Sequence, residues 1–418
     1  MRLKAALGWL GGGLALGFFC LAWPIYGFIS NQFEVARLPI GWAPLPKEPT
    51  PIDTVEINEA YRQASAAALK TLELHRQKIA APSLSAAVAV NGRVVWAGAV
   101  GWADVASRQP ATVQTRYRIG STSKPVGITA LARLVAAGVV TLDTPIATYD
   151  SDLPNQRWGR FTLGQLASHT AGLPEFEDNS DWIGFYQSLA LTTRFRDPEA
   201  ALSVFDGSRL LFEPGQRFHY SGYDNILISA VLQNVYGKHY DALMQEQVFA
   251  PLGIRSIAAD HAVSGKANRA TSYQVKAKQY KPWRRVDLSH KLAAGGFVAT
   301  PSDLALLGSA WLDEAFIPAA VRDIFWTPAV LADGSINEQN YALGFRRHTM
   351  QIDGVGEVAF LNHGGVSKGA QCWLAILPQH GLVIAISTNR RTDEFFDFAG
   401  VWPDLALPFL QAQTNAKR

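Results

Sequence analysis

The residues best suited to chemistry in this chain form the tetrapeptide Ser121-Thr122-Ser123-Lys124, the one S-x-x-K spacing in the sequence. Residues three apart share one face of a helix, so the Lys124 ammonium can approach the Ser121 hydroxyl. A buried lysine beside a hydroxyl can lose its proton or stabilise an alkoxide, and a helix N-terminus adds positive potential. The spacing predicts a nucleophilic serine, while an ordinary capped helix start explains the same residues.

The run from Ser121 to Val140 is apolar on nearly all sides, which predicts a helix buried inside a domain. Pro125 costs little there because first-turn N–H groups have no partner within the helix. Residues 84–90 and 93–100 are expected to be strands, and they flank Asn91-Gly92, a favoured type I′ hairpin turn.

Strand patterns return near the end of the chain, and mostly short helical and loop patterns fill the interval of about 148–330. The expected strands are 342–350, 358–362, 370–377 and 382–388, and a helix is expected from Thr392 to about Leu410. The pattern predicts an α/β fold in which one antiparallel sheet is built from both ends of the body, with a large helical insertion.

No charged residue occurs from Ala5 to Phe28, a length that predicts a transmembrane helix within residues 1–30. Arg2 and Lys4 precede the run and Arg37 is the first basic residue after it, so the amino terminus is expected in the cytoplasm. This assumes a bacterial inner membrane, crossed once, and places the catalytic body in the periplasm. A cleaved signal peptide is the alternative, although no small-x-small site follows.

Five prolines in residues 31–53 predict a stiff, extended tether between the membrane and the body. A helix is expected from Val55 to Lys78, and the body itself is expected to span residues 54–413.

Composition excludes several classes of function. A net charge of +3 over 418 residues gives no argument for a nucleic-acid partner. Two cysteines, with no HExxH or CxxC, predict neither disulfides nor a metal site, and no cofactor is expected. Cys372 falls on an expected buried strand, and His169 is expected to be structural. The basic stretch from Lys276 to Lys291 is expected to be a solvated loop, with lipid headgroups or acidic substrate as alternative partners.

Around the tetrapeptide the chain resembles the class C β-lactamase and penicillin-binding-protein-like serine hydrolases, and most closely their membrane-tethered peptidase subgroup. The segments that carry the resemblance cover most of residues 80–390 in the family's order: Tyr117-Arg118-Ile119-Gly120 before the tetrapeptide, 165–174, 213–221, Pro251-Leu252-Gly253-Ile254, Ala294-Gly295-Gly296-Phe297, Thr300-Pro301-Ser302-Asp303-Leu304 and His363-Gly364-Gly365.

The resemblance implies a catalytic role for three residues. Ser121 would be the acylated nucleophile and Lys124 its activating partner. Tyr220 would complete the base system, since a phenol near a cationic lysine can become a phenolate and pass protons to the leaving group.

The same resemblance implies that residues 363–366 bind substrate. His363 matches the family's third motif, and Gly364 and Gly365 would let a substrate backbone pair along that strand. The backbone N–H groups of Ser121 and Val366 would form the oxyanion hole.

Two departures from the family pattern argue against antibiotics as substrates. The second motif is commonly Tyr-x-Asn, but here it reads Tyr220-Ser221-Gly222, and a shifted match at Tyr223-Asp224-Asn225 is the alternative. His363 replaces the usual lysine, so the motif lacks a permanent cation for a substrate carboxylate.

These observations predict a membrane-anchored serine hydrolase that forms a Ser121 acyl-enzyme with peptide or ester substrates. A β-lactamase or D,D-peptidase is the alternative within this chemistry, and a catalytically silent, membrane-tethered scaffold is the alternative outside it. The oligomeric state stays open.

Overall fold

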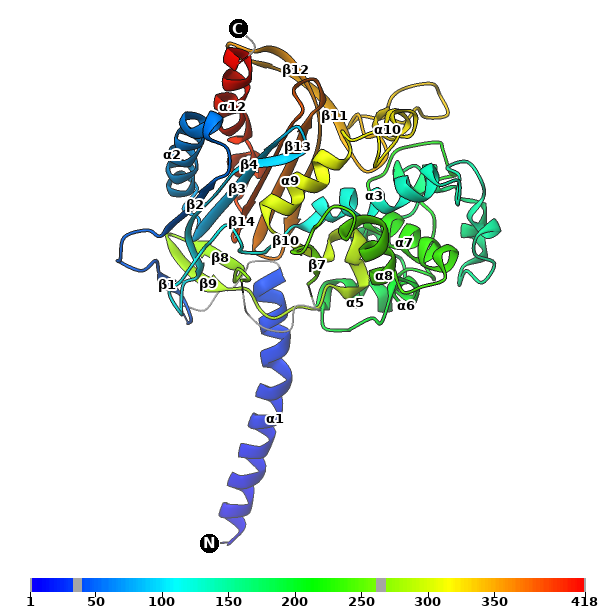
Figure 1. Ribbon diagram of the computed structural model, residues 1–418. Helices are drawn as coiled ribbons and strands as arrows, with labels where there is room; N and C mark the ends of the chain where they lie inside the picture. Colours follow the sequence, from blue (N-terminus) through cyan, green and yellow to red (C-terminus); the bar gives the residue numbers. More distant parts are fainter. Residues whose placement is uncertain (1, 33–39, 261–267, 417–418) are drawn as a thin grey trace.

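One antiparallel sheet runs through the body, with the strand order β11-β12-β13-β14-β3-β4-β2 and with β5 paired to β4 (Figure 1). The computed structural model describes residues 2–32, 40–260 and 268–416. The strands of this sheet are β2 Ile52–Glu56, β3 Ser83–Val90, β4 Arg93–Asp104, β5 Gln109–Pro110, β11 Arg346–Ile352, β12 Gly356–Ser367, β13 Ala370–Leu377 and β14 Leu382–Thr388.

The sheet joins the two ends of the body, as the sequence predicts. β14 pairs with β3 in an antiparallel register in which Ala385 faces Ala87. The β3–β4 turn has the predicted chemistry, because Asn91 and Gly92 both have positive φ, 48° and 81°. The α/β architecture with an antiparallel sheet is therefore confirmed.

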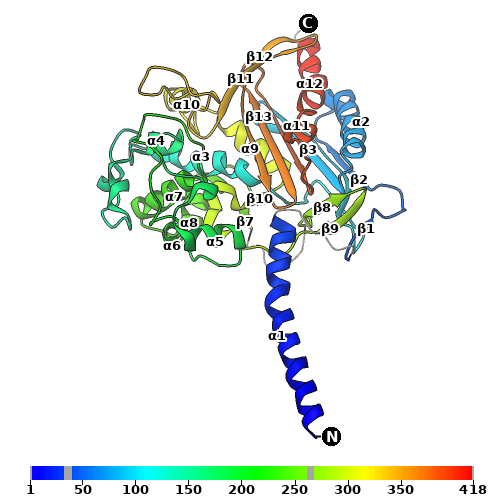
Figure 2. The same cartoon turned by 180° about the vertical axis from the view of Figure 1, so that it is seen from behind.

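Each face of the sheet contributes to a different core. Ala86 and Val88 of β3 belong to a core that includes residues of α2 and α12, whereas Ala87 and Ala89 belong to the core on the helical side. Figure 2 shows α2 and α12 on one side of the sheet and the helical region on the other. Side chains alternate along a strand, so nearly all-apolar strands can fill both cores.

The helical layer lies between β6 and β11 in the sequence and covers the side of the sheet near Ser121. The helices of the molecule are α1 Arg2–Gln32, α2 Arg62–Lys78, α3 Ser123–Ala136, α4 Leu163–Ala167, α5 Trp182–Ala190, α6 Pro198–Ala201, α7 Gly222–Tyr236, α8 Tyr240–Met244, α9 Pro301–Ala310, α10 Ala319–Trp326, α11 Phe395–Ala399 and α12 Trp402–Ala416. Short turns that matter below are η2 Gly120–Thr122, η8 Ser289–Lys291 and η9 Leu292–Gly296.

Two small sheets complete the fold. One joins β1 Ala43–Pro44, β9 Gln279–Pro282 and β8 Tyr273–Lys276, and the other joins β6 Tyr117–Arg118, β10 Phe297–Ala299 and β7 Ala258–Ala259. The basic stretch expected to be a solvated loop therefore begins as a hairpin.

The amino-terminal segment is helical, as the sequence predicts, but its expected role as a membrane span is a separate matter. α1 extends away from the body as one long helix (Figure 1). Among the described residues, none of the helices is long and apolar enough to cross a membrane, so the expected membrane span is not supported.

The expected tether is partly built into the body, because β1 pairs with β9 and β2 pairs with β4. Residues 33–39 of that segment lie outside the described residues. The helix expected from Val55 begins only at Arg62, since Val55 lies in β2, whose backbone groups pair with the β4 edge, and the Asn58 side chain caps a short turn after it.

Three element boundaries near the carboxyl end also differ from those expected from the sequence. β11 begins at Arg346 and not at Ala342, because Gly344 has a positive φ of 80° that interrupts an extended backbone. β12 continues to Ser367 along β13, past the expected end at Asn362. The single expected terminal helix is divided into α11 and α12.

Candidate active site

Ser121 lies where the end of β12 meets the turn before α3. β11 pairs only with residues 356–362, so residues 363–367 have β13 on one side and face η2 on the other. A Cβ on Gly365 would overlap the Ile119 carbonyl oxygen, and a Cβ on Gly120, whose φ is 53°, would overlap the Val366 backbone. Because neither glycine has a side chain, the backbones at Ser121 and Val366 can approach each other closely.

Lys124 is buried on the first turn of α3, with 2% of its side chain surface exposed. Its Nζ donates to Ser121 Oγ at 3.3 Å and to the Ala294 carbonyl oxygen of η9 at 3.0 Å. The same Nζ lies 4.5 Å from the centroid of the Tyr220 ring. The three residues that the sequence analysis assigns to catalysis therefore meet in space.

Tyr220 precedes α7 and is contacted by two cations. Besides Lys124, the Arg346 guanidinium carbon lies 5.4 Å from the Tyr220 ring centroid. The shifted alternative is not favoured, because the Tyr223 hydroxyl bonds Asn179 at 2.9 Å and Ser188 at 3.0 Å and burial raises the pKa of Tyr223 to about 12.

Behind Tyr220 lies a buried pair. His169 Nδ1 is 2.7 Å from Asp224 Oδ2, both side chains are essentially unexposed, and the His169 ring is 4.6 Å from the Tyr220 ring. Burial lowers the pKa of His169 well below its usual value, with Lys124 and His363 adding to the effect. Burial, assisted by Glu175, raises the pKa of Asp224 well above its usual value. Both shifts favour neutral groups, and His169 has the structural position expected of it.

His363 is fully buried and lines neither cavity described below. Its Nε2 is 3.1 Å from the Tyr341 hydroxyl, and burial lowers the pKa of His363 well below its usual value, with further lowering by Arg346 and Lys124. His363 therefore contacts Tyr341, whereas the sequence analysis expects it to contact the substrate directly. Tyr341 carries no recognisable local motif, so the sequence analysis did not find it.

The other three residues expected to bind substrate, Gly364, Gly365 and Val366, differ in how far they are exposed to the cavities at Ser121. Val366 is 43% exposed and lines the cavities on both sides of Ser121. Gly364 lines one of them, and a Cβ at this position would meet the Phe395 ring at 2.6 Å. Gly364 therefore makes room for an aromatic side chain, and Gly365 is needed for packing against η2.

Two cavities meet at Ser121 and Tyr220. One, of about 550 Å³, has many aromatic side chains in its wall: Phe360, Trp373, Phe395, Phe396 and Trp402. The other, of about 600 Å³, has charged residues in its wall: Lys124, Glu175, Glu177, Lys291, Lys368 and Arg391. Of these charged residues, the sequence analysis assigned Lys124 to catalysis and placed Lys291 in a basic stretch for which acidic substrate was an alternative partner. It did not single out Glu175, which directly follows the 165–174 segment, or Lys368, which follows Val366 by two positions.

Gly222, which replaces the usual asparagine of the second motif, lies against an acid. Its backbone N–H donates to Glu175 Oε2, and a Cβ on Gly222 would stand 3.4 Å from both carboxylate oxygens. A carboxylate therefore stands beside the position from which the asparagine side chain would project.

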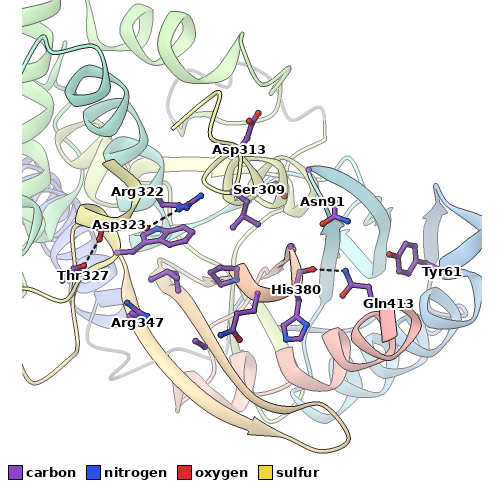
Figure 3. Close-up of a pocket in the computed structure, with 18 residues that line it drawn as sticks. Tyr61, Asn91, Ser309, Asp313, Arg322, Asp323, Thr327, Arg347, His380 and Gln413 are labelled. Atoms are coloured by element: carbon purple, nitrogen blue, oxygen red, sulfur yellow. Dashed lines mark hydrogen bonds and ion pairs between the residues drawn. The ribbon is translucent and has the colours of Figure 1, made fainter. Parts of the chain in front are cut away.

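A larger cavity, of about 1030 Å³, lies elsewhere and includes none of the predicted site residues (Figure 3). It is bordered by the β3–β4 turn at Asn91 and by Arg322, whose guanidinium lies 3.7 Å from the Asp323 carboxylate. Size alone does not identify the reactive site. Among the described residues, no cluster of three or more His, Cys, Asp or Glu side chains could hold a metal ion.

An antiparallel sheet covered by helices, with a serine and a buried lysine at the start of the central helix, is the architecture of the beta-lactamase-like serine hydrolases. A family model described as Beta-lactamase matches residues 69–403. The chain belongs to this family, and the resemblance found in the sequence is confirmed.

Individual relatives are distant. The chain is 25% identical over 414 residues to the human serine beta-lactamase-like protein LACTB, mitochondrial, with 76% of each chain covered. It is 30% identical over 179 residues to the esterase EstB of Burkholderia gladioli, covering 41% of this chain and 45% of that protein. The structure of a D-amino acid amidase from Ochrobactrum anthropi, complexed with L-phenylalanine amide, superposes with a TM-score of 0.68 at 22% identity, covering 85% of this chain and all of that one.

Proposed function

We propose that this protein hydrolyses ester or peptide bonds through an acyl-enzyme at Ser121. The observation that carries the proposal is the position of Lys124 Nζ, 3.3 Å from Ser121 Oγ and 4.5 Å from the Tyr220 ring centroid. The buried Lys124 side chain thus lies close to both a serine hydroxyl and a tyrosine ring, where an amine or a phenolate could accept the serine proton.

The reaction proceeds in two balanced halves. As Ser121 Oγ adds to the carbonyl carbon, its proton passes to the Lys124–Tyr220 pair, which reacts in the form that lacks one proton, as a neutral Lys124 amine or a Tyr220 phenolate. The tetrahedral intermediate then expels the alcohol or amine, which takes that proton from Tyr220. Water adds to the resulting ester and gives a proton to the same pair, and the acid leaves as Ser121 regains its proton.

The negative charge of the intermediate needs donors that are already in place. The backbone N–H groups of Ser121 and Val366 are proposed for this role. Support comes from Gly120 and Gly365, whose missing side chains allow the two backbone segments to approach closely.

The proposed substrates are esters and peptides in preference to penicillins. Gly222 provides no side-chain amide for a penicillin acylamino group, and the Glu175 carboxylate stands beside that position. The names of similar proteins, an esterase and an amidase, agree with this preference.

The test is the intact mass after exposure of the full chain to a fluorophosphonate and, separately, to benzylpenicillin. A single fluorophosphonate adduct is expected in the wild type and in Ser203→Ala, an exposed serine outside the site, but not in Ser121→Ala. Little or no penicillin adduct is expected. A stable penicillin adduct at Ser121 would favour a β-lactamase or D,D-peptidase, and folded protein without either adduct would favour a scaffold.

We also propose that residues 5–28 attach the protein to a bacterial inner membrane, with the body in the periplasm. The support is the charge-free run preceded by Arg2 and Lys4. Extraction of membranes with carbonate should leave the full chain in the pellet, and insertion of two lysines within residues 12–17 should release it. Release of the unaltered chain by carbonate would contradict this attachment.

A further inference from the structure

The outer face of α5 exposes large apolar side chains to solvent. Trp182 is 81% exposed, Ile183 73% and Tyr186 63%. Residues three and four apart lie side by side on a helix, so the three side chains share one face. Single exposed apolar residues are ordinary, but a cluster of this kind is typical of a surface that binds a partner. Hydrolysis at Ser121 gives this face no role.

The body holds α5 firmly by its inner face. The Asp181 carboxylate caps the helix, because it accepts from two N–H groups of the first turn, each at 3.0 Å. A Cβ on Gly184 would overlap the Val204 carbonyl oxygen, so the helix packs closely there. The Ser188 hydroxyl lies 3.0 Å from the Tyr223 hydroxyl. The inner face is thus committed to the body, and the apolar residues of the outer face have no place in its core.

One arginine joins α5 to the end of the charge-free run in α1. Arg284 Nη2 donates to the Leu189 carbonyl oxygen of α5 at 3.2 Å, and the Arg284 guanidinium carbon lies 5.6 Å from the centroid of the Phe28 ring. Figures 1 and 2 both show α5 and the β8–β9 hairpin at the end of the body from which α1 extends. A lipid surface bound by α1 would therefore meet the body at this end.

The basic stretch from Lys276 to Lys291 gives the same end an excess of positive charge. It has six basic residues and one acidic residue, Asp287. Lys276 and Lys278, at the turn between β8 and β9, and Arg285 are exposed. Cations beside aromatic and aliphatic side chains suit an anionic bilayer, since the charges meet the headgroups and the apolar groups reach the acyl chains. The position beside α1 favours a lipid surface over a protein partner.

Acidic residues gather at the start of α5. Glu177 and Asp178 are exposed there, and Asp181 is used by the helix cap. The expected attraction to anionic lipid therefore comes from the basic stretch, and α5 contributes apolar contacts rather than charge.

We propose that the outer face of α5 and the exposed cations of the basic stretch bind the surface of an anionic lipid bilayer. The proposal goes beyond hydrolysis at Ser121, and it adds a contact of the body to the proposed attachment by α1. In this arrangement α5 stands between the lipid surface and the active site, because Phe185, Ser188 and Leu189 of the same helix line the charged cavity that contains Ser121.

A fluorescent label tests whether α5 touches lipid. In a Cys20→Ser background the remaining native thiol, Cys372, is buried. Ile183→Cys is labelled with an NBD group, and the full chain is reconstituted in vesicles of phosphatidylcholine and phosphatidylglycerol. Blue-shifted emission and quenching by lipids with a nitroxide near the headgroup are expected. The matched control is Asp353→Cys, an exposed position in the turn between β11 and β12 at the opposite end of the body (Figure 1), which should show neither change.

The charge of the lipid tests the role of the basic stretch. The changes at position 183 should be smaller in vesicles of phosphatidylcholine alone and at about 0.5 M salt, because salt screens exposed charges. Lys276→Gln combined with Lys278→Gln should also reduce them. Lys70→Gln, an exposed lysine of α2, is the control and should leave them unaltered.

The insertion of two lysines within residues 12–17 removes the contact of α1 and leaves that of the body. Binding of this variant to anionic vesicles at low salt should persist, and Trp182→Ser with Tyr186→Ser should weaken it at least about tenfold. The matched control is Ile324→Ser with Ile336→Ser, which are 53% and 56% exposed and should leave the binding unchanged. Thermal melts of each variant exclude unfolding as the cause.

Any of four results would overturn the proposal. These are solvent-like emission from position 183 in vesicle-bound protein, no vesicle binding by the two-lysine variant, equal binding by the two pairs of serine variants, and a soluble dimer that Trp182→Ser dissociates. The last result would assign the face to a second copy of the chain. Carbonate extraction of the unaltered chain tests attachment by α1 separately, and fluorophosphonate labelling of Ser121 needs no lipid, so failure of the proposed function is distinguishable.

Discussion

The Tyr220 ring lies 4.6 Å from the ring of His169, so the side chain proposed to move protons packs against a histidine that is itself held neutral. His169 Nδ1 is near both the Ser221 N–H, at 3.4 Å, and Asp224 Oδ2, at 2.7 Å. A neutral His169 can approach Asp224 this closely when a protonated carboxyl group donates to Nδ1. The raised pKa of Asp224 agrees with this assignment.

This assignment predicts that Asp224→Asn is mild and Asp224→Ala is severe. An amide N–H can donate to His169 Nδ1 as the carboxylic acid does, whereas alanine leaves a buried nitrogen without its partner at a cost of about 1–3 kcal/mol. Urea unfolding should show little loss for the asparagine variant, and its kcat should stay within about threefold of wild type. Equal destabilisation by both substitutions would contradict this account.

Loss of the lysine that touches the nucleophile should abolish turnover with little change in fold. Lys124→Met keeps the length of the side chain but removes the group 3.3 Å from Ser121 Oγ, so kcat/KM for an activated ester should fall by at least about 10³. Lys70→Met, on the exposed face of α2, is the matched control and should retain full activity. Residual activity above a tenth of wild type in Lys124→Met would contradict the proposed mechanism.

The close approach of β12 to η2 predicts that Gly365→Ala is harmful to both stability and activity. Its Cβ would overlap the Ile119 carbonyl oxygen, and relief of the overlap must separate Val366 from Ser121. We expect a loss of about 1–3 kcal/mol in stability, typical of overpacking, and a fall in kcat. Gly295→Ala is the stability control because its Cβ would meet nothing closer than 3.7 Å. Equal melting temperatures for the two variants would reject this account.

Acid should destabilise the protein below about pH 6.5. Burial lowers the pKa of His169, His290 and His363, so these groups stay neutral in the folded state but bind protons after unfolding. The unfolded state then holds more protons, and stability falls as the pH falls through the ordinary histidine pKa of about 6.5. Asp224, with its raised pKa, acts in the opposite direction, whereas His75 and His348, whose pKa values are also lowered by burial, add to the effect of the three histidines.

The measurement is the urea midpoint at pH 7.5, 6.5 and 5.5 at constant ionic strength. The midpoint should decrease in that order, with the larger step below pH 6.5. A midpoint that is independent of pH would show that the buried histidines bind protons equally in the folded state.

Short-range patterns in the sequence determined much of the scaffold. β13 and β14 occupy the expected residues 370–377 and 382–388, and the Asn91-Gly92 turn joins β3 to β4, because alternation and turn geometry depend on near neighbours. The proximity of Ser121 and Lys124 has the same origin, since helical spacing alone places them on one face. The order of the family motifs then identified Tyr220.

Tertiary structure alone decided which distant residues surround this pair. Burial of His363 against Tyr341, and the meeting of Lys291 with Lys368 at one cavity, depend on how the helical insertion packs against the sheet. The edge strand β2 likewise depends on pairing with β4, which overrides the helical pattern at Val55. Such contacts join residues far apart in the chain, and no local periodicity encodes them. The sequence therefore determined that Ser121 and Lys124 lie side by side, and packing decided the charge and shape of the space around them.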